Sequence, residues 1–172
     1  MPKTVTVWFT GLPSSGKTTV AVEVLRALRC RDRAAELLDG DEIRRWLWPE
    51  LGFSKEDRDK NVRRLGYIAN LISRNGVITL VAAVSPYRAV RDEVRVLLGA
   101  FIEVYVSAPV ETCFNRDTKG LYKKATEGEI KNLTGFDDPY EPPLSPEVMI
   151  DTSRSSLFEC SRKVLDALGG KI

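Results

Sequence analysis

GLPSSGKT, residues 11–18, is the stretch that decides the fold. It matches the pattern G-x-x-x-x-G-K-[ST]. A short β-branched and aromatic run precedes it at residues 4–10, and apolar residues at helical spacing follow it at 20–28. Glycines let backbone N–H groups turn inward around phosphate oxygens, and the N-terminus of the following helix adds its positive end. Strand, loop and helix in this order predict a phosphate-binding loop.

Within this loop, Lys17 can reach the β and γ phosphates of ATP, and Thr18 can offer its hydroxyl to Mg²⁺. A glycine-bearing turn capped by a threonine is the alternative, but it does not explain why strand, spacing and helix coincide. The motif therefore indicates an ATP-dependent phosphotransferase. The expected ATP-binding residues are Gly11, Leu12, Pro13, Ser14, Ser15, Gly16, Lys17, Thr18 and Thr19.

Further strand-like and helical segments alternate along the chain. Short apolar runs at 34–38, 77–84, 101–106 and 147–150 predict strands, and each of the first three stops at polar or turn-forming residues. Helical patterns occupy 41–47, 56–73, 89–98, 110–116 and 156–168, the last followed by Gly169-Gly170. This alternation predicts an α/β fold with three α/β/α layers and a five-stranded, mainly parallel sheet.

Composition bounds the function further. A length of 172 residues fits a single domain over 1–172, and a net charge of +2 gives no strong field for nucleic acid. Three widely spaced cysteines argue against a disulfide framework or a paired-cysteine metal site. No apolar run approaches the length of about 20 residues that a membrane span needs. We expect a soluble, cytoplasmic protein with no nucleic-acid or membrane partner.

The chain contains no histidine, so proton transfer falls to a carboxylate or to the substrate. Asp39 and Asp41 follow the second predicted strand, and ligands bind at the carboxyl ends of strands in open α/β sheets. Two carboxylates there can hold Mg²⁺ and accept a hydroxyl proton. The alternative, compatible with this role, is that Asp41 caps the helix that starts at Glu42.

Positive charge gathers on the next helices. Arg58, Asn61 and Arg64 are spaced three apart and share one helix face, while Arg44 and Arg45 come from the preceding helix. They can form a basic wall for an anionic substrate or an ordinary solvated surface, and spacing alone leaves both readings open.

Residues 117–146 are rich in Lys, Gly, Pro and acidic side chains and have weak periodicity, so we expect a lid over the site. Its lysines, of which Lys119 is the first, can screen phosphates or simply be exposed. Ser85-Pro86 can contribute to the site or be only a helix N-cap followed by proline. Local sequence decides neither question.

These pieces together resemble the adenylylsulfate kinase family of P-loop kinases, from residue 5 to about 152. The blocks that carry the resemblance are LLDGDEIR (37–44), LGFSKEDRDKNVRRLG (51–66), SPYRAVRDEVR (85–95), RDTKGLYKKA (116–125) and TGFDDPYEPP (134–143). The resemblance implies ATP- and Mg²⁺-dependent phosphorylation of the 3′-hydroxyl of adenosine 5′-phosphosulfate, a step of sulfate activation and assimilation, to 3′-phosphoadenosine 5′-phosphosulfate and ADP. It also implies a homodimer in the stand-alone form.

Carried over position by position, the resemblance assigns the acceptor side of the site. It implies that Phe53 stacks on the substrate adenine and that Asp41 lies near the attacking hydroxyl. The implied substrate-binding residues are Asp41, Arg44, Phe53, Arg58, Asn61, Val84, Ser85, Lys119 and Leu133. Lys17, Asp41 and Ser85 are the implied catalytic residues, with Thr18 and, through water, Asp39 at the metal.

The chain departs from the family at two places. Leu133 stands where relatives commonly carry an aromatic residue, so apolar contact without π-stacking replaces one half of an aromatic sandwich. Glu42 and Arg45 stand where relatives commonly have Asn and His, which predicts a charge of each sign near the pocket.

Two other functions remain open from the sequence. One is a small-molecule kinase of the same architecture that acts on a sugar or nucleoside. The other is a nucleotide-binding switch of the GTPase kind, because Asp117-Thr118-Lys119-Gly120 matches D-x-x-G. That string follows the fourth strand, which is the wrong place for a switch protein, and no Asn-Lys-x-Asp segment is present to read guanine.

Overall fold

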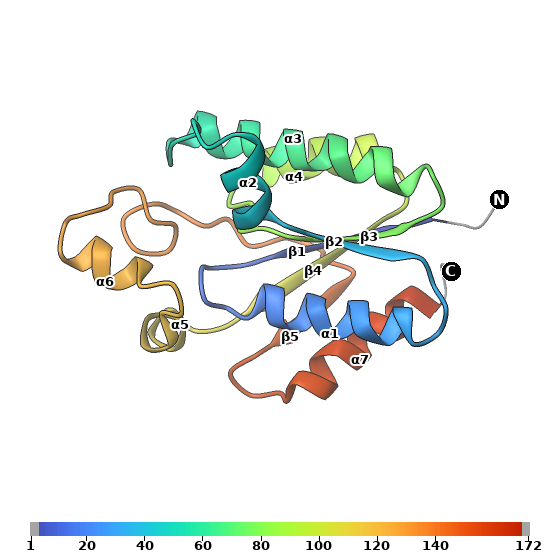
Figure 1. Ribbon diagram of the computed structural model, residues 1–172. Helices are drawn as coiled ribbons and strands as arrows, with labels where there is room; N and C mark the ends of the chain where they lie inside the picture. The colour runs from blue at the N-terminus through green and yellow to red at the C-terminus, as the bar shows by residue number, and fades with distance from the viewer. Residues whose placement is uncertain (1–3, 170–172) are drawn as a thin grey trace.

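The computed structural model describes residues 4–169, which form a parallel sheet covered by helices on both faces (Figure 1). The strands are β1 Thr6–Thr10, β2 Ala35–Asp39, β3 Ile78–Ala82, β4 Phe101–Ser107 and β5 Val148–Asp151. The helices are α1 Lys17–Arg29, α2 Gly40–Leu47, α3 Lys55–Ser73, α4 Arg88–Leu98, α5 Val110–Arg116, α6 Leu121–Thr126 and α7 Leu157–Gly169.

The sheet order is β2-β3-β1-β4-β5, and every strand pair is parallel. The structure thus confirms the α/β fold. A mainly parallel sheet was expected, and in the described residues the sheet is wholly parallel. All five residues of β1 and of β3 are buried, because both faces of these strands are covered. In the register, Val7 lies beside Leu80 on one side and Ile102 on the other.

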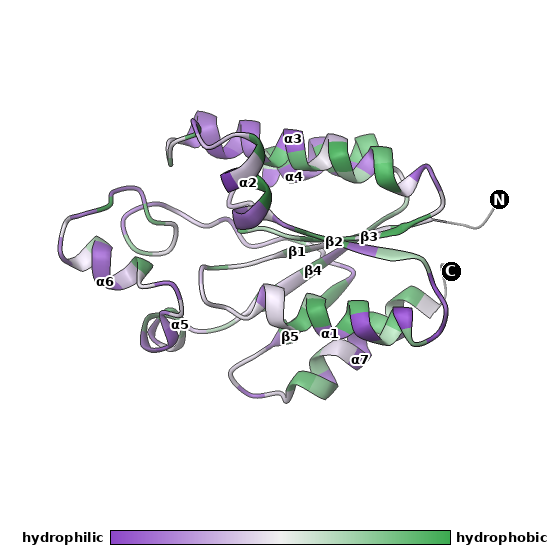
Figure 2. Ribbon diagram, viewed as in Figure 1, coloured by the Kyte–Doolittle hydropathy of each residue, from purple (hydrophilic) through white to green (hydrophobic). Residues whose placement is uncertain are grey.

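Helices α1 and α7 cover one face of the sheet, and α2, α3 and α4 cover the other (Figure 1). Alternate residues of β1 serve the two layers: Phe9 belongs to the apolar cluster with Val24 of α1, and Trp8 to the cluster with Leu65 of α3. Figure 2 shows hydrophobic segments along both α1 and α3, and the buried residues of these helices include Val24 and Leu65. Burial of these two stripes holds the three layers together.

The chain reverses its direction of winding at β1, which lies between β3 and β4. In a doubly wound sheet, such a switch point leaves a crevice at the carboxyl ends of the strands. The loop at residues 11–16 starts there, directly after β1. The fold therefore positions the glycine loop at the edge of the sheet where ligands bind.

Most expected elements are found with ends shifted by one to three residues. The exception is α6, a six-residue helix inside the segment that was expected to lack regular structure. Its Tyr122 is fully buried and packs with Cys113 of α5 in a third apolar cluster. Six residues are too few to show helical periodicity, which is why the sequence pattern missed this helix.

One expectation concerns the C-terminal end of the chain. Gly169 is the last residue of α7, and its expected companion Gly170 lies outside the described residues. Within residues 4–169, no helix combines the length and the apolar composition that crossing a bilayer demands.

Candidate active site

The glycine loop has the backbone conformation that phosphate binding needs. Ser14 and Gly16 both have positive φ, 60° and 95°, so the chain turns tightly before α1 begins at Lys17. A Cβ on Gly11 would lie 2.4 Å from the carbonyl oxygen of Val106, so only glycine fits there. The first N–H groups of α1 consequently face an open cleft.

This cleft has a volume of about 380 Å³. Its lining includes Pro13, Ser14, Gly16, Lys17, Thr18 and Thr19 of the expected ATP-binding set. The other three members lie behind the loop surface: Gly11 and Leu12 present carbonyls to Lys17, and Ser15 is fully buried.

Lys17 is folded back on its own loop. Its Nζ donates to the carbonyl oxygens of Gly11, at 3.0 Å, and Leu12, at 2.7 Å. The residue is only 9% exposed, and this burial lowers the pKa of the ammonium from 10.5 to about 8, against the opposing charge of Asp41. Phosphate oxygens would supply the negative charge that the two neutral carbonyls lack.

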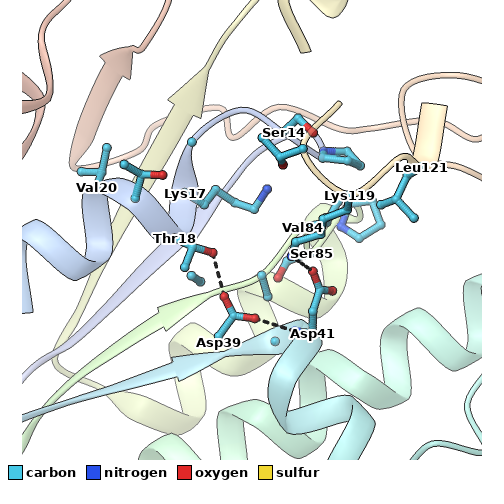
Figure 3. A pocket seen from close by; sticks show the side chains of 18 of the residues that line it. Ser14, Lys17, Thr18, Val20, Asp39, Asp41, Val84, Ser85, Lys119 and Leu121 are labelled. Atoms are coloured by element: carbon cyan, nitrogen blue, oxygen red, sulfur yellow. Dashed lines mark hydrogen bonds and ion pairs between the residues drawn. The ribbon is translucent and has the colours of Figure 1, made fainter. Parts of the chain in front are cut away.

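Asp39 joins the glycine loop to the second strand. Its Oδ2 accepts a hydrogen bond of 2.7 Å from Thr18 Oγ1, and its Oδ1 accepts from the backbone N–H groups of Asp41 and Glu42 (Figure 3). Asp39 is therefore the N-cap of α2. The alternative in which Asp41 caps this helix is wrong, because the cap lies two residues earlier, at Asp39, and the Asp41 carboxylate does not serve as the cap.

Asp41 projects into the cleft and pairs with Lys119 from the lid, as Figure 3 shows. Both side chains are more than half exposed, at 60% and 52%, so this pair contributes little stability. It nevertheless joins α2 to the segment that was expected to form the lid.

The opposite wall of the cleft combines an aromatic ring with two guanidinium groups. Arg44 lies over the Phe53 ring at 4.5 Å and Arg58 at 5.5 Å. Backbone carbonyls fix both arginines: Arg44 donates to Gly52 at 2.8 Å, and Arg58 Nε to Phe53 at 3.0 Å. Asn61 is positioned by the Trp48 indole, whose Nε1 donates to Asn61 Oδ1 at 2.6 Å.

The open question of the basic wall is thus answered in part. Arg44, Arg58 and Asn61 line the cleft, but Arg64 pairs with Glu50 at 2.8 Å. Arg45 is exposed and lies outside the cleft lining, as does Glu42. The expected extra charges therefore lie at the surface of α2.

The expected lid segment, 117–146, contributes Thr118, Lys119, Leu121 and Leu133 to the cleft lining. Leu133 is 5% exposed and packs in the third apolar cluster with Tyr122. Arg58 also contacts the lid, since its Nη2 donates to the Asn132 carbonyl and its Nε lies 3.7 Å from Asp138. One arginine of α3 therefore faces both the cleft and the lid.

Val84 and Ser85 form the floor of the cleft between β3 and α4. Ser85 has φ +46° and is 2% exposed, and its Oγ accepts from Trp8 Nε1 at 3.0 Å. The N-cap of α4 is Tyr87, without a side-chain cap, so the reading of Ser85 as that cap is wrong. Such a backbone conformation persists only where the surroundings hold it.

Sequence reasoning missed the far end of the cleft, beyond the phosphate loop. Arg116 of α5 donates to Thr152 Oγ1 at 3.0 Å and to its carbonyl oxygen at 2.7 Å, and Thr152 Oγ1 donates to the Ser15 carbonyl. The missed lining residues at this end are Arg116, Thr118, Thr152, Ser155, Leu157 and Cys160. Their place after β4 and β5 was the available signal, since the carboxyl ends of parallel strands share one edge.

A phosphate loop at the switch point and two carboxylates at the end of β2 and the start of α2, all on one cleft, define a phosphate-loop kinase. The family model for adenylylsulphate kinase matches residues 3–151. The chain belongs to the adenylylsulfate kinase family.

Similar proteins agree with this assignment. An adenylyl-sulfate kinase of Rippkaea orientalis is 56% identical over 164 residues, which cover 95% of this chain and 91% of that protein. The solved structure of the Mycobacterium tuberculosis APS kinase CysC in complex with AMPPNP and APS is 42% identical, with a TM-score of 0.93 and coverage of 98% and 99%. A sugar kinase from Janibacter sp., 20% identical with a TM-score of 0.64, shares 96% and 95% coverage and shows the fold alone.

Proposed function

We infer that the protein is an adenylylsulfate kinase, which transfers the γ-phosphoryl group of ATP to the 3′-hydroxyl of adenosine 5′-phosphosulfate. The products are 3′-phosphoadenosine 5′-phosphosulfate and ADP. The observation that carries this conclusion is one cleft with the phosphate loop in its middle, an arginine-flanked aromatic ring at one end and an arginine-threonine corner at the other. Such a cleft suits two nucleotides whose phosphates meet.

We assign the ATP subsite to the loop and the Arg116–Thr152 corner. The N–H groups at the start of α1 bind the phosphates, and Lys17 turns from its two carbonyls toward them. Leu157 offers an apolar surface to the adenine. This subsite extends the nine residues expected from the motif to the ends of β4 and β5.

We assign the acceptor subsite to the opposite end. The Phe53 ring offers a face for the adenine, and Leu133 covers it from the lid without stacking. Arg44, Arg58 and Asn61 surround the phosphosulfate and ribose. Guanidinium groups suit this task because their planar donors match the oxygens of phosphate and sulfate.

The residues beside the loop fit a magnesium ion. A hydroxyl and a carboxylate, from Thr18 and Asp39, already meet at 2.7 Å, and Mg²⁺ prefers such oxygen ligands together with water and phosphates. Within residues 4–169, no group of three or more His, Cys, Asp or Glu side chains could form a protein-only metal site. An ion held by Thr18 and, through water, by Asp39 would neutralise charge on the β and γ phosphates.

Catalysis then rests on positioning and charge. Asp41 orients the 3′-hydroxyl and accepts its proton, while Lys17 stabilises charge that develops on the transferring group. Lys119 pairs with Asp41 and is therefore close enough to contact the acceptor nucleotide when the lid closes. Direct transfer between two bound nucleotides requires no covalent intermediate on Ser85, which we place in the acceptor pocket.

An acceptor panel tests the function. With ATP and Mg²⁺, adenosine 5′-phosphosulfate should give ADP and a bisphosphorylated product by mass spectrometry, whereas AMP, adenosine and sugars should give far less. Turnover of a sugar or nucleoside with no turnover of adenosine 5′-phosphosulfate would overturn the assignment.

The switch-protein alternative gains no support from the geometry. Asp117 of the D-x-x-G string accepts hydrogen bonds from the N–H groups of Tyr122 and Lys123, so it serves the start of α6. We expect ATP to bind more tightly than GTP. A strong GTP preference in a competition assay would revive this alternative.

We also propose a cytoplasmic homodimer, in line with the expectation from the family resemblance. Light scattering coupled to size-exclusion chromatography measures the mass of the assembly directly. A mass of one 19.3 kDa chain across micromolar concentrations would contradict the dimer.

A further inference from the structure

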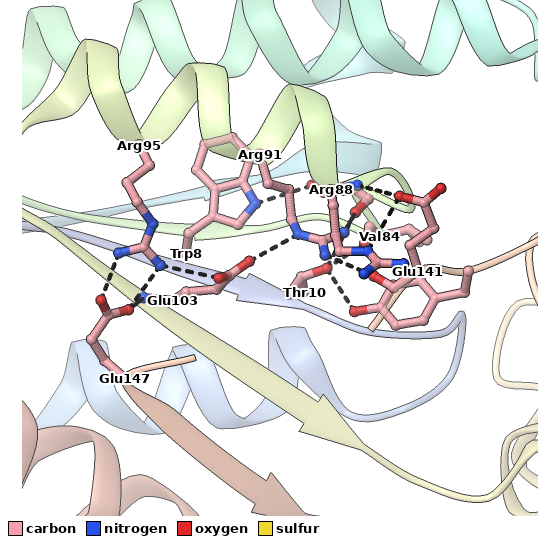
Figure 4. A network of polar contacts seen from close by, with 11 residues as sticks. Trp8, Thr10, Val84, Arg88, Arg91, Arg95, Glu103, Glu141 and Glu147 are labelled. Atoms are coloured by element: carbon pink, nitrogen blue, oxygen red, sulfur yellow. Dashed lines mark hydrogen bonds and ion pairs between the residues drawn. The ribbon is translucent and has the colours of Figure 1, made fainter. Parts of the chain in front are cut away.

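A buried polar network lies behind the floor of the cleft, and the reaction proposed above does not use it (Figure 4). Its centre is the ion pair of Arg91 and Glu103, with Nε and Oε1 at 2.8 Å and side chains only 2% and 8% exposed. Arg95 contacts Glu103 at 3.1 Å and pairs with Glu147. The positive charges of Arg91 and Arg95 thus offset the negative charges of Glu103 and Glu147 in a largely buried network.

Arg91 uses its remaining donors on two carbonyl oxygens from distant segments. Its Nη1 donates to Ser85 at 2.6 Å, and its Nη2 donates to Glu141 at 2.7 Å. Ser85 is the floor of the acceptor pocket, and Glu141 lies where the lid returns toward β5. One side chain therefore joins the pocket floor to the root of the lid, the segment Tyr140–Glu141.

Other hydrogen bonds join the same two segments. Glu141 N donates to the Pro86 carbonyl at 2.8 Å, and Arg88 N donates to the Glu141 carboxylate at 2.7 Å. The Tyr140 hydroxyl lies 2.9 Å from Thr10 Oγ1 of β1, which in turn donates to the Val84 carbonyl at 2.7 Å. The floor and the lid root consequently form one hydrogen-bonded block.

The Arg91–Glu103 ion pair is better suited to fixing the positions of its neighbours than to stabilising the fold. A buried ion pair adds little net stability compared with apolar residues of the same volume, because desolvation offsets its attraction. A guanidinium group can serve three acceptors in one plane, as Arg91 does, whereas an ammonium on a flexible stem cannot fix them in this way. The positive φ of Ser85 is the conformation that such an external hold would maintain.

We propose that Arg91 is a positioning residue for the acceptor: it holds the Ser85 carbonyl and the lid root together, so the acceptor pocket keeps its shape while the outer lid moves. This proposal rests on the acceptor subsite assigned above. It predicts that loss of Arg91 harms use of the acceptor nucleotide far more than use of ATP, whose subsite lies at the other end of the cleft.

The test compares Arg91→Lys with Arg95→Lys, a matched change in the same network that leaves both carbonyl contacts intact. For Arg91→Lys, the KM for adenosine 5′-phosphosulfate should rise about tenfold or more, with kcat lowered and the KM for ATP within about twofold. Hydrogen exchange should accelerate together in peptides spanning 83–89 and 138–143. Arg95→Lys should leave both readouts near wild type.

A double variant, Arg91→Met with Glu103→Gln, guards against misfolding because it leaves no unpaired charge between these two positions. It should melt cooperatively and still show the acceptor defect. Unchanged acceptor KM in both Arg91 variants, equal rises in both KM values, or the same defect in Arg95→Lys would overturn the proposal. If wild type fails to phosphorylate adenosine 5′-phosphosulfate, the proposed function fails, while the exchange data still decide whether Arg91 joins the two segments.

Discussion

At the scale of single residues, the surroundings of Lys17 suit the binding of negatively charged phosphates. Its ammonium is buried against two neutral carbonyls, and burial lowers its pKa to about 8. The protonated form of Lys17 is therefore less stable than it would be in water. Phosphate oxygens should raise the pKa again, because opposite charge nearby stabilises the protonated amine.

We therefore predict that nucleotide binding takes up protons. In free protein Lys17 is largely neutral above its pKa of about 8, and with ATP bound it should stay protonated toward the ordinary value of 10.5. At pH 9, ATP binding should take up to one proton, measured by calorimetry in two buffers of different ionisation enthalpy. Lys17→Met should bind without this uptake, and equal uptake in both proteins would contradict the prediction.

The residue scale also shows what the sequence could predict. The motif located Lys17 and Thr18 because their roles follow from spacing along a single turn. The pairing of Arg64 with Glu50 depends on where the loop between α2 and α3 lies, which no local pattern contains. Arg116 and Thr152 were missed for the same reason, since they meet only when the sheet forms.

At the scale of elements, Asp39 has two roles. It caps the start of α2, and it supplies the negative charge of the proposed metal site. One carboxylate oxygen accepts from two N–H groups of the helix, and the other accepts from Thr18. Asparagine can cap the helix as aspartate does, but it carries no negative charge for the proposed metal site.

We predict that Asp39→Asn and Asp39→Ala separate these roles. Because Asn caps as well as Asp, Asp39→Asn should keep the free energy of unfolding within about 0.5 kcal/mol of wild type, whereas Asp39→Ala should lose about 1 kcal/mol. Both variants should need more Mg²⁺ for half-maximal activity. Urea denaturation and Mg²⁺ titration measure the two effects, and unaltered Mg²⁺ dependence in Asp39→Asn would remove Asp39 from the metal site.

The lid meets the phosphate loop at Gly135. A Cβ on this residue would lie 2.5 Å from Leu12 Cδ2, and its φ is +85°. Gly128, also in the lid, has φ +74° but nothing within 4 Å of its Cβ position. The two glycines share the backbone requirement, and of the two only a Cβ on Gly135 would meet the phosphate loop.

We predict that Gly135→Ala lowers kcat by about tenfold, since the added methyl group keeps the lid from seating on the phosphate loop. Gly128→Ala should cost comparable stability, about 1 kcal/mol, with kcat near wild type. Steady-state kinetics and thermal melting measure both. Equal kcat values in the two variants would show that the lid does not act through this contact.

At the scale of the whole molecule, the parallel sheet explains why residues far apart in sequence form one site. The phosphate loop follows β1, Asp39 ends β2, Ser85 follows β3 and Thr152 follows β5. Alternation of strands and helices predicted this architecture, because each apolar run and each helical pattern is local. The strand order, the helix in the lid and the network around Arg91 involve long-range contacts, and only the folded chain shows them.

We expect two nucleotides to occupy the one cleft, on either side of Lys17 and Asp41. A crystal structure with adenosine 5′-phosphosulfate and a non-hydrolysable ATP analogue tests it most directly. We predict that the adenine of the acceptor stacks on Phe53, that its 3′-hydroxyl faces Asp41, and that the adenine of the ATP analogue lies beside Arg116. An acceptor bound elsewhere, or a 3′-hydroxyl turned away from the γ-phosphate with Asp41 out of reach, would contradict the account.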